Sequence, residues 1–249
     1  TFPGKGDGGT TDTFQARYQN QRGGLALANG TVYVAWASHE DAKPYYGWVM
    51  SFNASNLAQS AVLNVTPDSQ YGGIWMGGGS PAIDSSNNLY LLTGNGNFNA
   101  TSPTVPNKDY GDSFLKLSNS LLISQYFTPS DQATDNSNDQ DFGSGGAAIL
   151  VDLPTNGGAT PTHLVLGGGK DGYLYALNRD NLGGSGDANA WQRFNFGYSM
   201  FGTGAFWNFK FYLAGNGGLM QQFTLNASTA QFNAVATAVS ANKFGFPGS

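Results

Sequence analysis

The sequence predicts an all-β protein assembled from repeated four-stranded antiparallel units, and three observations lead to this prediction. Glycine supplies 36 of the 249 residues, about twice its usual share, whereas charged residues make up 11% against a usual level of about 25%. Aromatic residues reach 14% and occur in short runs with β-branched neighbours, as in residues 31–34. Such a chain is rich in turns and strands and poor in solvent-exposed helix surface.

The third observation is an internal repeat with two halves. The first half is a strand, a tight turn and a second strand. The second half is a strand in which apolar and polar residues alternate, followed by a turn and a further strand such as 121–127. Each unit therefore contains four strands. The first halves are residues 25–35, 81–92, 147–152 with 163–166, and 204–214, and the second halves begin with 47–53, 112–118, 172–178 and 219–226.

A four-stranded antiparallel unit repeated in tandem is typical of a β-propeller blade, in which radial packing hides most sheet edges. A β-sandwich is the alternative. We expect one propeller domain over residues 1–249 with about four blades and partial blade segments at both ends. Further chain or another subunit would complete a larger ring of seven or eight blades. The approximate blades are 21–70, 71–130, 143–200 and 201–242.

Three insertions rich in Gly, Asn and Asp interrupt the repeat, at 97–111, 130–146 and 154–162. Their composition predicts loops that decorate one face of the molecule. The glycine runs 77–79 and 167–169 lack the helix and the Lys-Ser/Thr pair of a phosphate-binding loop. We expect these glycines where blades crowd together and side chains do not fit.

Charge and composition exclude several classes of function. The net charge is -5 without any cluster of Lys or Arg, so nothing neutralises a nucleic-acid backbone, and no apolar stretch is long enough for a membrane span. The absence of Cys excludes disulfides, thiolate catalysis and Cys-based zinc sites, and two histidines are too few for a His-rich metal site. Low charge with abundant Ser, Thr, Asn and Gly is typical of exported proteins, so we expect a secreted or periplasmic location.

Four segments, covering roughly residues 20–180, resemble in their order the propeller of pyrroloquinoline quinone (PQQ) dependent alcohol dehydrogenases. They look still closer to a group of PQQ-like propeller proteins. The last segment occurs in nearly every PQQ-like repeat, so it supports the fold far more than a function. The segments are Gly72-Gly-Ile-Trp-Met-Gly77, Leu92-Thr-Gly-Asn-Gly96, Tyr126-Phe-Thr-Pro-Ser-Asp131 and Gly169-Lys-Asp-Gly-Tyr-Leu-Tyr-Ala-Leu-Asn178.

The resemblance implies a site for PQQ and Ca²⁺. In that family a glutamate, an asparagine and an aspartate bind the ion, a tryptophan forms the floor beneath the quinone, and a Lys or Arg contacts it. Because Ca²⁺ binds oxygen at 2.3–2.6 Å, the asparagine and the aspartate must lie within about 8 Å of each other to share one ion. The corresponding residues here are Glu40, Asn95 and Asp139 (or Asp141) for the metal, that same aspartate as the catalytic base, Trp75 for the floor and Lys170 for the cofactor contact.

Each of these residues also has a structural interpretation. Glu40 can be a solvated loop carboxylate, Asn95 beside glycine a turn former, and Trp75 part of the packed core. Lys170 suits a β-turn before a strand, and the acidic stretch 131–141 suits a solvated or calcium-binding loop.

Two classes of function therefore stay open. One is a non-catalytic secreted module whose loop face binds a small molecule, a carbohydrate or a protein. The other is a PQQ- and calcium-dependent dehydrogenase that oxidises an alcohol or a sugar. Departures from the family pattern favour the first class: extra residues after Glu40, a glycine insertion after Trp75 and the lengthened stretch 131–141.

Overall fold

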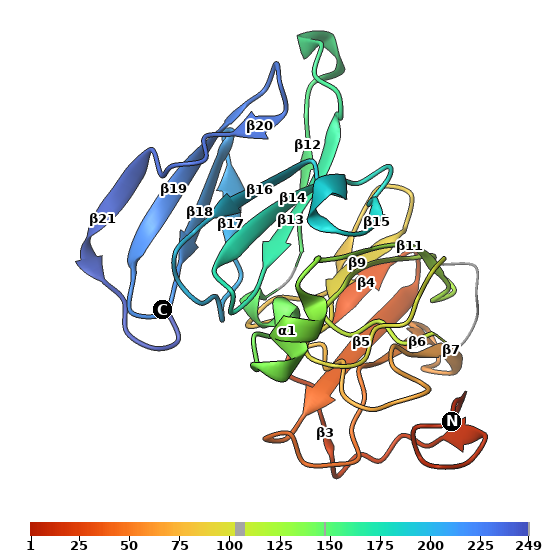
Figure 1. The fold of residues 1–249 in the computed structure, drawn as a ribbon. Helices are drawn as coiled ribbons and strands as arrows, with labels where there is room; N and C mark the ends of the chain where they lie inside the picture. The colour runs from red at the N-terminus through yellow and green to blue at the C-terminus, as the bar shows by residue number, and fades with distance from the viewer. Residues whose placement is uncertain (103–107, 147, 249) are drawn as a thin grey trace.

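Four antiparallel β-sheets stand side by side in the computed structural model, which describes residues 1–102, 108–146 and 148–248. Within each sheet the main strands follow one another in sequence order (Figure 1). Such a meander results when short turns join neighbouring antiparallel strands. The predicted four-stranded units are confirmed.

The first two sheets come from the N-terminal half of the chain. In sheet 1, β5 and β6 pair from Thr31 with Asn53 to Trp36 with Trp48. In sheet 2, β15 comes from much later in the chain and joins β11 as a parallel edge strand. Sheet 1 contains β3 (Gln19–Asn20), β4 (Ala26–Ala28), β5 (Thr31–Ser38), β6 (Trp48–Asn53) and β7 (Gln59–Asn64), and sheet 2 contains β8 (Ala82–Ile83), β9 (Leu89–Leu92), β10 (Phe114–Leu117), β11 (Ile123–Thr128) and β15 (Gly184–Ser185).

Sheets 3 and 4 repeat the arrangement in the C-terminal half. The central pair of sheet 3, β13 and β14, joins Leu164 to Asn178 and Gly168 to Leu174. Sheet 3 contains β12 (Ile149–Asp152), β13 (His163–Gly168), β14 (Tyr173–Asn178) and β16 (Gln192–Asn195), and sheet 4 contains β17 (Ala205–Trp207), β18 (Lys210–Ala214), β19 (Leu219–Asn226), β20 (Gln231–Phe232) and β21 (Ala238–Lys243).

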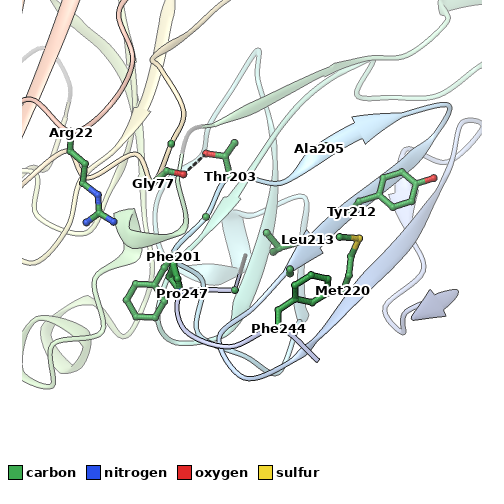
Figure 2. Close-up of a pocket in the computed structure, with 14 residues that line it drawn as sticks. Arg22, Gly77, Phe201, Thr203, Ala205, Tyr212, Leu213, Met220, Phe244 and Pro247 are labelled. Carbon is green, nitrogen blue, oxygen red and sulfur yellow. Dashed lines mark hydrogen bonds between the residues drawn. The ribbon is translucent and has the colours of Figure 1, made fainter. Parts of the chain in front are cut away.

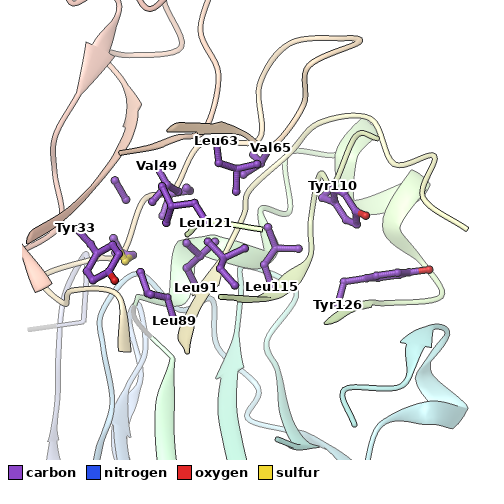
Figure 3. Close-up of a cluster of buried hydrophobic side chains, with 14 of the residues drawn as sticks. Tyr33, Val49, Leu63, Val65, Leu89, Leu91, Tyr110, Leu115, Leu121 and Tyr126 are labelled. Carbon is purple, nitrogen blue, oxygen red and sulfur yellow. The ribbon is translucent and has the colours of Figure 1, made fainter. Parts of the chain in front are cut away.

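The core lies between the sheets, because alternate residues of a strand point to opposite faces. Leu89 and Leu91 of β9 face sheet 1, whereas Tyr90 and Leu92 face sheet 3. Sheet 3 is likewise buried on both faces, which explains its continuous apolar runs. Figure 3 shows the cluster between sheets 1 and 2, which includes Tyr33, Val49, Leu63, Val65, Leu89, Leu91, Tyr110, Leu115, Leu121 and Tyr126.

Glycine allows the sheets to approach closely, as the sequence predicts for its glycine runs. A Cβ at Gly77 would lie 1.9 Å from the carbonyl oxygen of Phe201, and a Cβ at Gly167 would lie 2.6 Å from the ring of Phe114. No side chain fits at these distances. The two halves of the chain therefore pack together at positions where glycine, which has no side chain, leaves room for the neighbouring sheet.

The N-terminal segment covers the outer face of sheet 1. It begins with the strand pair β1 (Phe2–Pro3) and β2 (Thr11–Asp12). Phe2 and Phe14 pack against the buried cluster around Trp48 on this face. The corresponding outer face of sheet 4 has Trp207 69% exposed.

The prediction of loops throughout 130–146 is wrong. This insertion contains the helix α1 (Gln132–Ser137) and a 3₁₀ turn, η1 (Phe142–Gly145). The Asp131 carbonyl accepts hydrogen bonds from the amides of Thr134 and Asp135, which closes the first turn. In 154–162 there is a single 3₁₀ turn, η2 (Thr155–Gly157), and part of the 97–111 insertion lies outside the described residues.

No helix among the described residues is both long enough and apolar enough to cross a membrane.

Candidate functional site

Three loops bring together four of the residues implied by the resemblance. Asn95 follows β9, Asp139 and Asp141 follow α1, and Lys170 lies in the turn between β13 and β14. These loops belong to sheets 2 and 3, which are adjacent. The candidate site is therefore built across the junction of two blades.

Hydrogen bonds and ion pairs connect these side chains directly. The Asn95 side-chain Nδ2 donates to Asp139 Oδ1 at 2.8 Å, and its backbone N–H donates to Asp141 Oδ1, also at 2.8 Å. The Lys170 Nζ lies 2.9 Å from Asp139 Oδ1 and 2.6 Å from Asp141 Oδ2. The asparagine and both aspartates therefore lie within the 8 Å limit for a shared ion.

The two aspartates differ in how deeply they are buried. The side chain of Asp141 is 9% exposed, whereas that of Asp139 is 75% exposed. Burial raises the pKa of Asp141, and the charge of Lys170 opposes this rise without cancelling it. Burial lowers the pKa of Lys170, but the charge and hydrogen bond of Asp141 outweigh this effect and leave the pKa above its usual value. Lys170 is therefore a charged partner of both aspartates.

Trp75 lies behind this cluster. A Cβ at Gly94 would lie 2.3 Å from Asp141 Oδ1 and 2.7 Å from Trp75 Nε1, so only glycine leaves room between them. The Trp75 Nε1 is buried and has no hydrogen-bond partner among the described residues, and the same holds for Asn95 Oδ1. Gly94 is thus a structural requirement of the site.

Asp112 is a buried carboxyl group beneath the site. It is fully buried and accepts hydrogen bonds from the Phe142 N–H at 3.1 Å and from Gln132 Nε2 at 3.2 Å. Burial, with the nearby charge of Asp141, raises its pKa to about 8. Asp112 therefore retains its proton at neutral pH.

Glu40 is not joined to this cluster. It is exposed, with a left-handed backbone at φ 50°. In the described parts of the chain, no hydrogen bond or ion pair links it to Asn95, Asp139 or Lys170. A search of the same parts also finds no group of three or more His, Cys, Asp or Glu side chains arranged to hold a metal ion.

A cavity of about 410 Å³ opens beside Asn95 and Asp139. Lys43 Nζ lies 4.6 Å from the centre of the Tyr71 ring, and Tyr45 donates a hydrogen bond from its hydroxyl to Asp41 Oδ1 at 2.8 Å. The sequence gives no signal for these four residues, because they lie in the loops after β5 and β7 and belong to no motif of the repeat. The full lining is Asp41, Lys43, Tyr45, Tyr71, Asn95, Asn136 and Asp139.

A second cavity of about 640 Å³ lies between sheet 4 and the segment around Gly77. Its lining is mainly apolar, with Arg22 and Phe201 toward one side and Tyr212 and Met220 toward the other (Figure 2). It shares no lining residue with the first cavity.

Comparison with known proteins identifies the fold. No protein-family description and no curated protein sequence matches the chain. Several solved structures are similar to it, and three of them are described here. The quinohemoprotein alcohol dehydrogenase ADHIIG from Pseudomonas putida HK5 matches with a TM-score of 0.60 and 14% identity, over 91% of this chain and 41% of its own. A europium-containing methanol dehydrogenase gives a TM-score of 0.54 and 13% identity, over 84% of this chain and 47% of its own.

The third structure is BamB from Moraxella catarrhalis, with a TM-score of 0.47 and 12% identity, over 84% of this chain and 51% of its own. The chain thus spans less than two thirds of each of these proteins. Identities this low show the fold and not the activity. The chain is a β-propeller of the fold found in the quinohemoprotein alcohol dehydrogenase and the methanol dehydrogenase.

Proposed function

We propose that this propeller is a non-catalytic binding module and that the cavity beside Asn95 and Asp139 binds a small polyhydroxylated ligand such as a sugar. The observation that carries the proposal is the composition of the cavity lining. Tyr45 and Tyr71 supply aromatic surface, and Asn95, Asn136 and Asp139 supply amide and carboxylate groups. A few oriented polar groups beside aromatic surface are typical of small-molecule sites.

The charge pairing supports binding rather than catalysis. Lys170 is already ion-paired with Asp139 and Asp141, and Asn95 presents an N–H group to Asp139. As arranged, these side chains do not fit a calcium site, since Ca²⁺ requires six to eight oxygen ligands and Glu40 is not part of the cluster. We derive no catalytic step from them.

The second candidate function is the PQQ- and calcium-dependent oxidation of an alcohol or a sugar. One observation favours it: Asn95, Asp139, Asp141, Lys170 and Trp75 lie together, as the resemblance implies for such an enzyme. In that case Asp139 or Asp141 would act as the base, Trp75 would lie under the quinone, and Lys170 would contact it.

A binding assay with two arms tests the proposal. The chain is titrated with a panel of mono- and disaccharides by calorimetry, and separately with PQQ and CaCl₂ while dye reduction is followed with alcohols and sugars. We expect saturable sugar binding that Asn136→Ala weakens about tenfold, the loss of about one hydrogen bond to a ligand. Asn138→Ala is the matched control, because this exposed residue does not line the cavity.

The outcomes separate the two candidates. If no sugar binds, or if Asn136→Ala and Asn138→Ala weaken binding equally, the cavity is not the sugar site. If dye is reduced only with PQQ and CaCl₂, the dehydrogenase function replaces the binding function.

The same proposal includes a secreted or periplasmic location, a single propeller domain over residues 1–249, and further blades supplied by additional chain or by another subunit. The low charge of the sequence supports the secreted or periplasmic location. The 69% exposed Trp207 on the outer face of sheet 4 supports the further blades, which would cover it. A protein ligand on the loop face belongs to the same class of function.

A further inference from the structure

A third cavity, of about 470 Å³, is lined mainly by the N-terminal segment and is termed the N-terminal cavity. Lys43 lines both this cavity and the candidate cavity beside Asn95 and Asp139. The two cavities therefore meet at one side chain and form a continuous groove. Each of them is as large as a typical small-molecule site, which measures roughly 300–1,000 Å³. The other residues that line the N-terminal cavity are Gly6, Asp7, Thr13, Gln15, Pro44 and Gln70.

Two chain segments form the boundary between the cavities, and backbone hydrogen bonds join them. The first segment contains Lys43 and Tyr45. The second contains Gln70 and Tyr71, so each segment lines both cavities. The Tyr71 N–H donates to the Tyr45 carbonyl at 2.9 Å, and the Gly47 N–H donates to the Tyr71 carbonyl at 2.9 Å. Because the Lys43 ammonium also lies over the Tyr71 ring, the boundary is a fixed part of the fold.

The wall formed by the N-terminal segment is tied to the rest of the protein. Tyr46 donates a hydrogen bond from its hydroxyl to Asp7 Oδ1 at 2.6 Å. The Thr13 N–H donates to Asp7 Oδ2 at 2.9 Å, and Gln70 Nε2 donates to the Gly6 carbonyl at 3.3 Å. Since these contacts hold the wall in place, little rearrangement is needed for binding, and this favours affinity.

Three polar side chains of the groove have capacity for hydrogen bonds to a ligand. In the parts of the chain that the structure describes, the Thr13 hydroxyl makes no hydrogen bond and the Lys43 ammonium makes no ion pair. Gln15 Oε1 has one long contact, at 3.5 Å from Arg17 Nη2. Hydroxyl and amide groups both donate and accept hydrogen bonds, and an ammonium group donates them. This set suits a ligand that carries hydroxyl groups along its length.

Carboxylates outnumber cations along the groove. Among the described residues that line it, Asp7, Asp41 and Asp139 are acidic, and Lys43 is the one basic side chain. Lys170 pairs with Asp139, and a net negative charge is left in the groove. A negative groove repels an anionic polysaccharide. The ligand that fits this charge is therefore an uncharged one.

We propose that the ligand is a neutral oligosaccharide that extends from the candidate cavity across Lys43 into the N-terminal cavity. One sugar unit lies beside Asn95 and Asp139, the next crosses Lys43, and the last contacts Thr13 and Gln15. This inference rests on the proposed function and deepens it, because it states how long the ligand is and which charge it carries.

Calorimetry with sugars of increasing length tests the proposal. The chain is titrated with maltose, maltotriose, maltotetraose and maltohexaose, and with the cello-oligosaccharides of the same lengths. In at least one series we expect the affinity to rise about tenfold from the disaccharide to the tetrasaccharide, the gain of about one hydrogen bond. It should then level off once the groove is filled. Tetragalacturonate, an acidic sugar of the same length, should bind more weakly than the neutral tetrasaccharide.

Variants separate the two cavities. Gln15→Ala and Thr13→Val should each weaken tetrasaccharide binding about tenfold and leave disaccharide binding unchanged, because only the longer sugar reaches the N-terminal cavity. Asn136→Ala should weaken both lengths, since Asn136 lines the candidate cavity. Gln231→Ala is the matched control, because Gln231 is an exposed residue of β20 that lines neither cavity.

The outcomes distinguish failure of this inference from failure of the proposed function. If the disaccharide binds and a longer sugar binds no more tightly, the extension is overturned and the binding module stands. The same holds if Gln15→Ala and Thr13→Val behave like Gln231→Ala. Tighter binding of tetragalacturonate overturns the neutral ligand. If no sugar of any length binds, the proposed function fails together with this inference.

Discussion

Lys170 Nζ lies 2.6 Å from Asp141 Oδ2 and joins the turn between β13 and β14 to the segment after α1. This ion pair is largely buried, with the two side chains 18% and 9% exposed. It positions Asp141 to accept the backbone hydrogen bond from Asn95. One contact thus connects the three loops of the candidate site.

Removal of this cation should destabilise the protein. We expect Lys170→Met to lower the free energy of unfolding at pH 7 by about 2 kcal/mol, because it leaves a buried carboxylate without its partner. Urea denaturation measures the effect. In the double variant Lys170→Met with Asp141→Asn part of the loss should be recovered, and the exposed Lys243→Met should be neutral. Equal losses in the single and double variants would contradict the pairing.

A side chain added at Gly94 should displace Asp141 and Trp75, the two groups on either side of it. The Cβ of Gly94→Ala would lie 2.3 Å from Asp141 Oδ1 and 2.7 Å from Trp75 Nε1, so these groups must move apart. We expect a loss of about 1–3 kcal/mol in stability, as for other overpacked cores, together with a change in tryptophan fluorescence. Thermal unfolding measures the first effect. Gly245→Ala is the control, since no atom lies within 4 Å of its Cβ.

The buried Asp112 should make stability depend on pH. Burial raises its pKa from 3.8 to about 8, so between these values the folded chain holds a proton that the unfolded chain lacks. Stability contributed by this group therefore falls as the pH rises from about 4 to about 8, by up to ~1.4 kcal/mol per pH unit. Urea denaturation from pH 5 to pH 8 should show a shallower slope for Asp112→Asn than for the wild-type chain. Parallel slopes would show that Asp112 does not titrate in this range.

A second buried carboxyl group fastens the N-terminal segment. Asp12 is fully buried and accepts hydrogen bonds from Asn64 Nδ2 at 2.9 Å and from the Asp7 N–H at 3.0 Å. Asp12→Ala leaves the buried Asn64 amide without its acceptor, which costs about 1–3 kcal/mol. We expect faster proteolysis within residues 1–20 while the remaining sheets stay protected. Asp12→Asn retains an acceptor oxygen and should be cleaved more slowly than Asp12→Ala.

The amino-acid sequence alone determined the four-stranded units, because strand periodicity and turn residues act over a few neighbouring positions. The runs at 89–92 and 173–178 became β9 and β14. The sequence also placed Asn95 and Lys170 in turns at the ends of these strands. It misjudged 130–146, since a six-residue polar helix such as α1 has no apolar stripe and depends on contacts that are distant in sequence.

Only the tertiary structure decided which loops meet. Asn95 and Asp139 are 44 residues apart in the chain, yet their side chains share a hydrogen bond. Glu40, by contrast, is not joined to them, and Lys43, Tyr45 and Tyr71 line the cavity instead. The stacking of sheets 2 and 3 brings the loops of the site together, and no local pattern encodes the distance between two loops of different blades. For the same reason, the pairing of Lys170 with Asp139 and Asp141 could be read only from the folded chain.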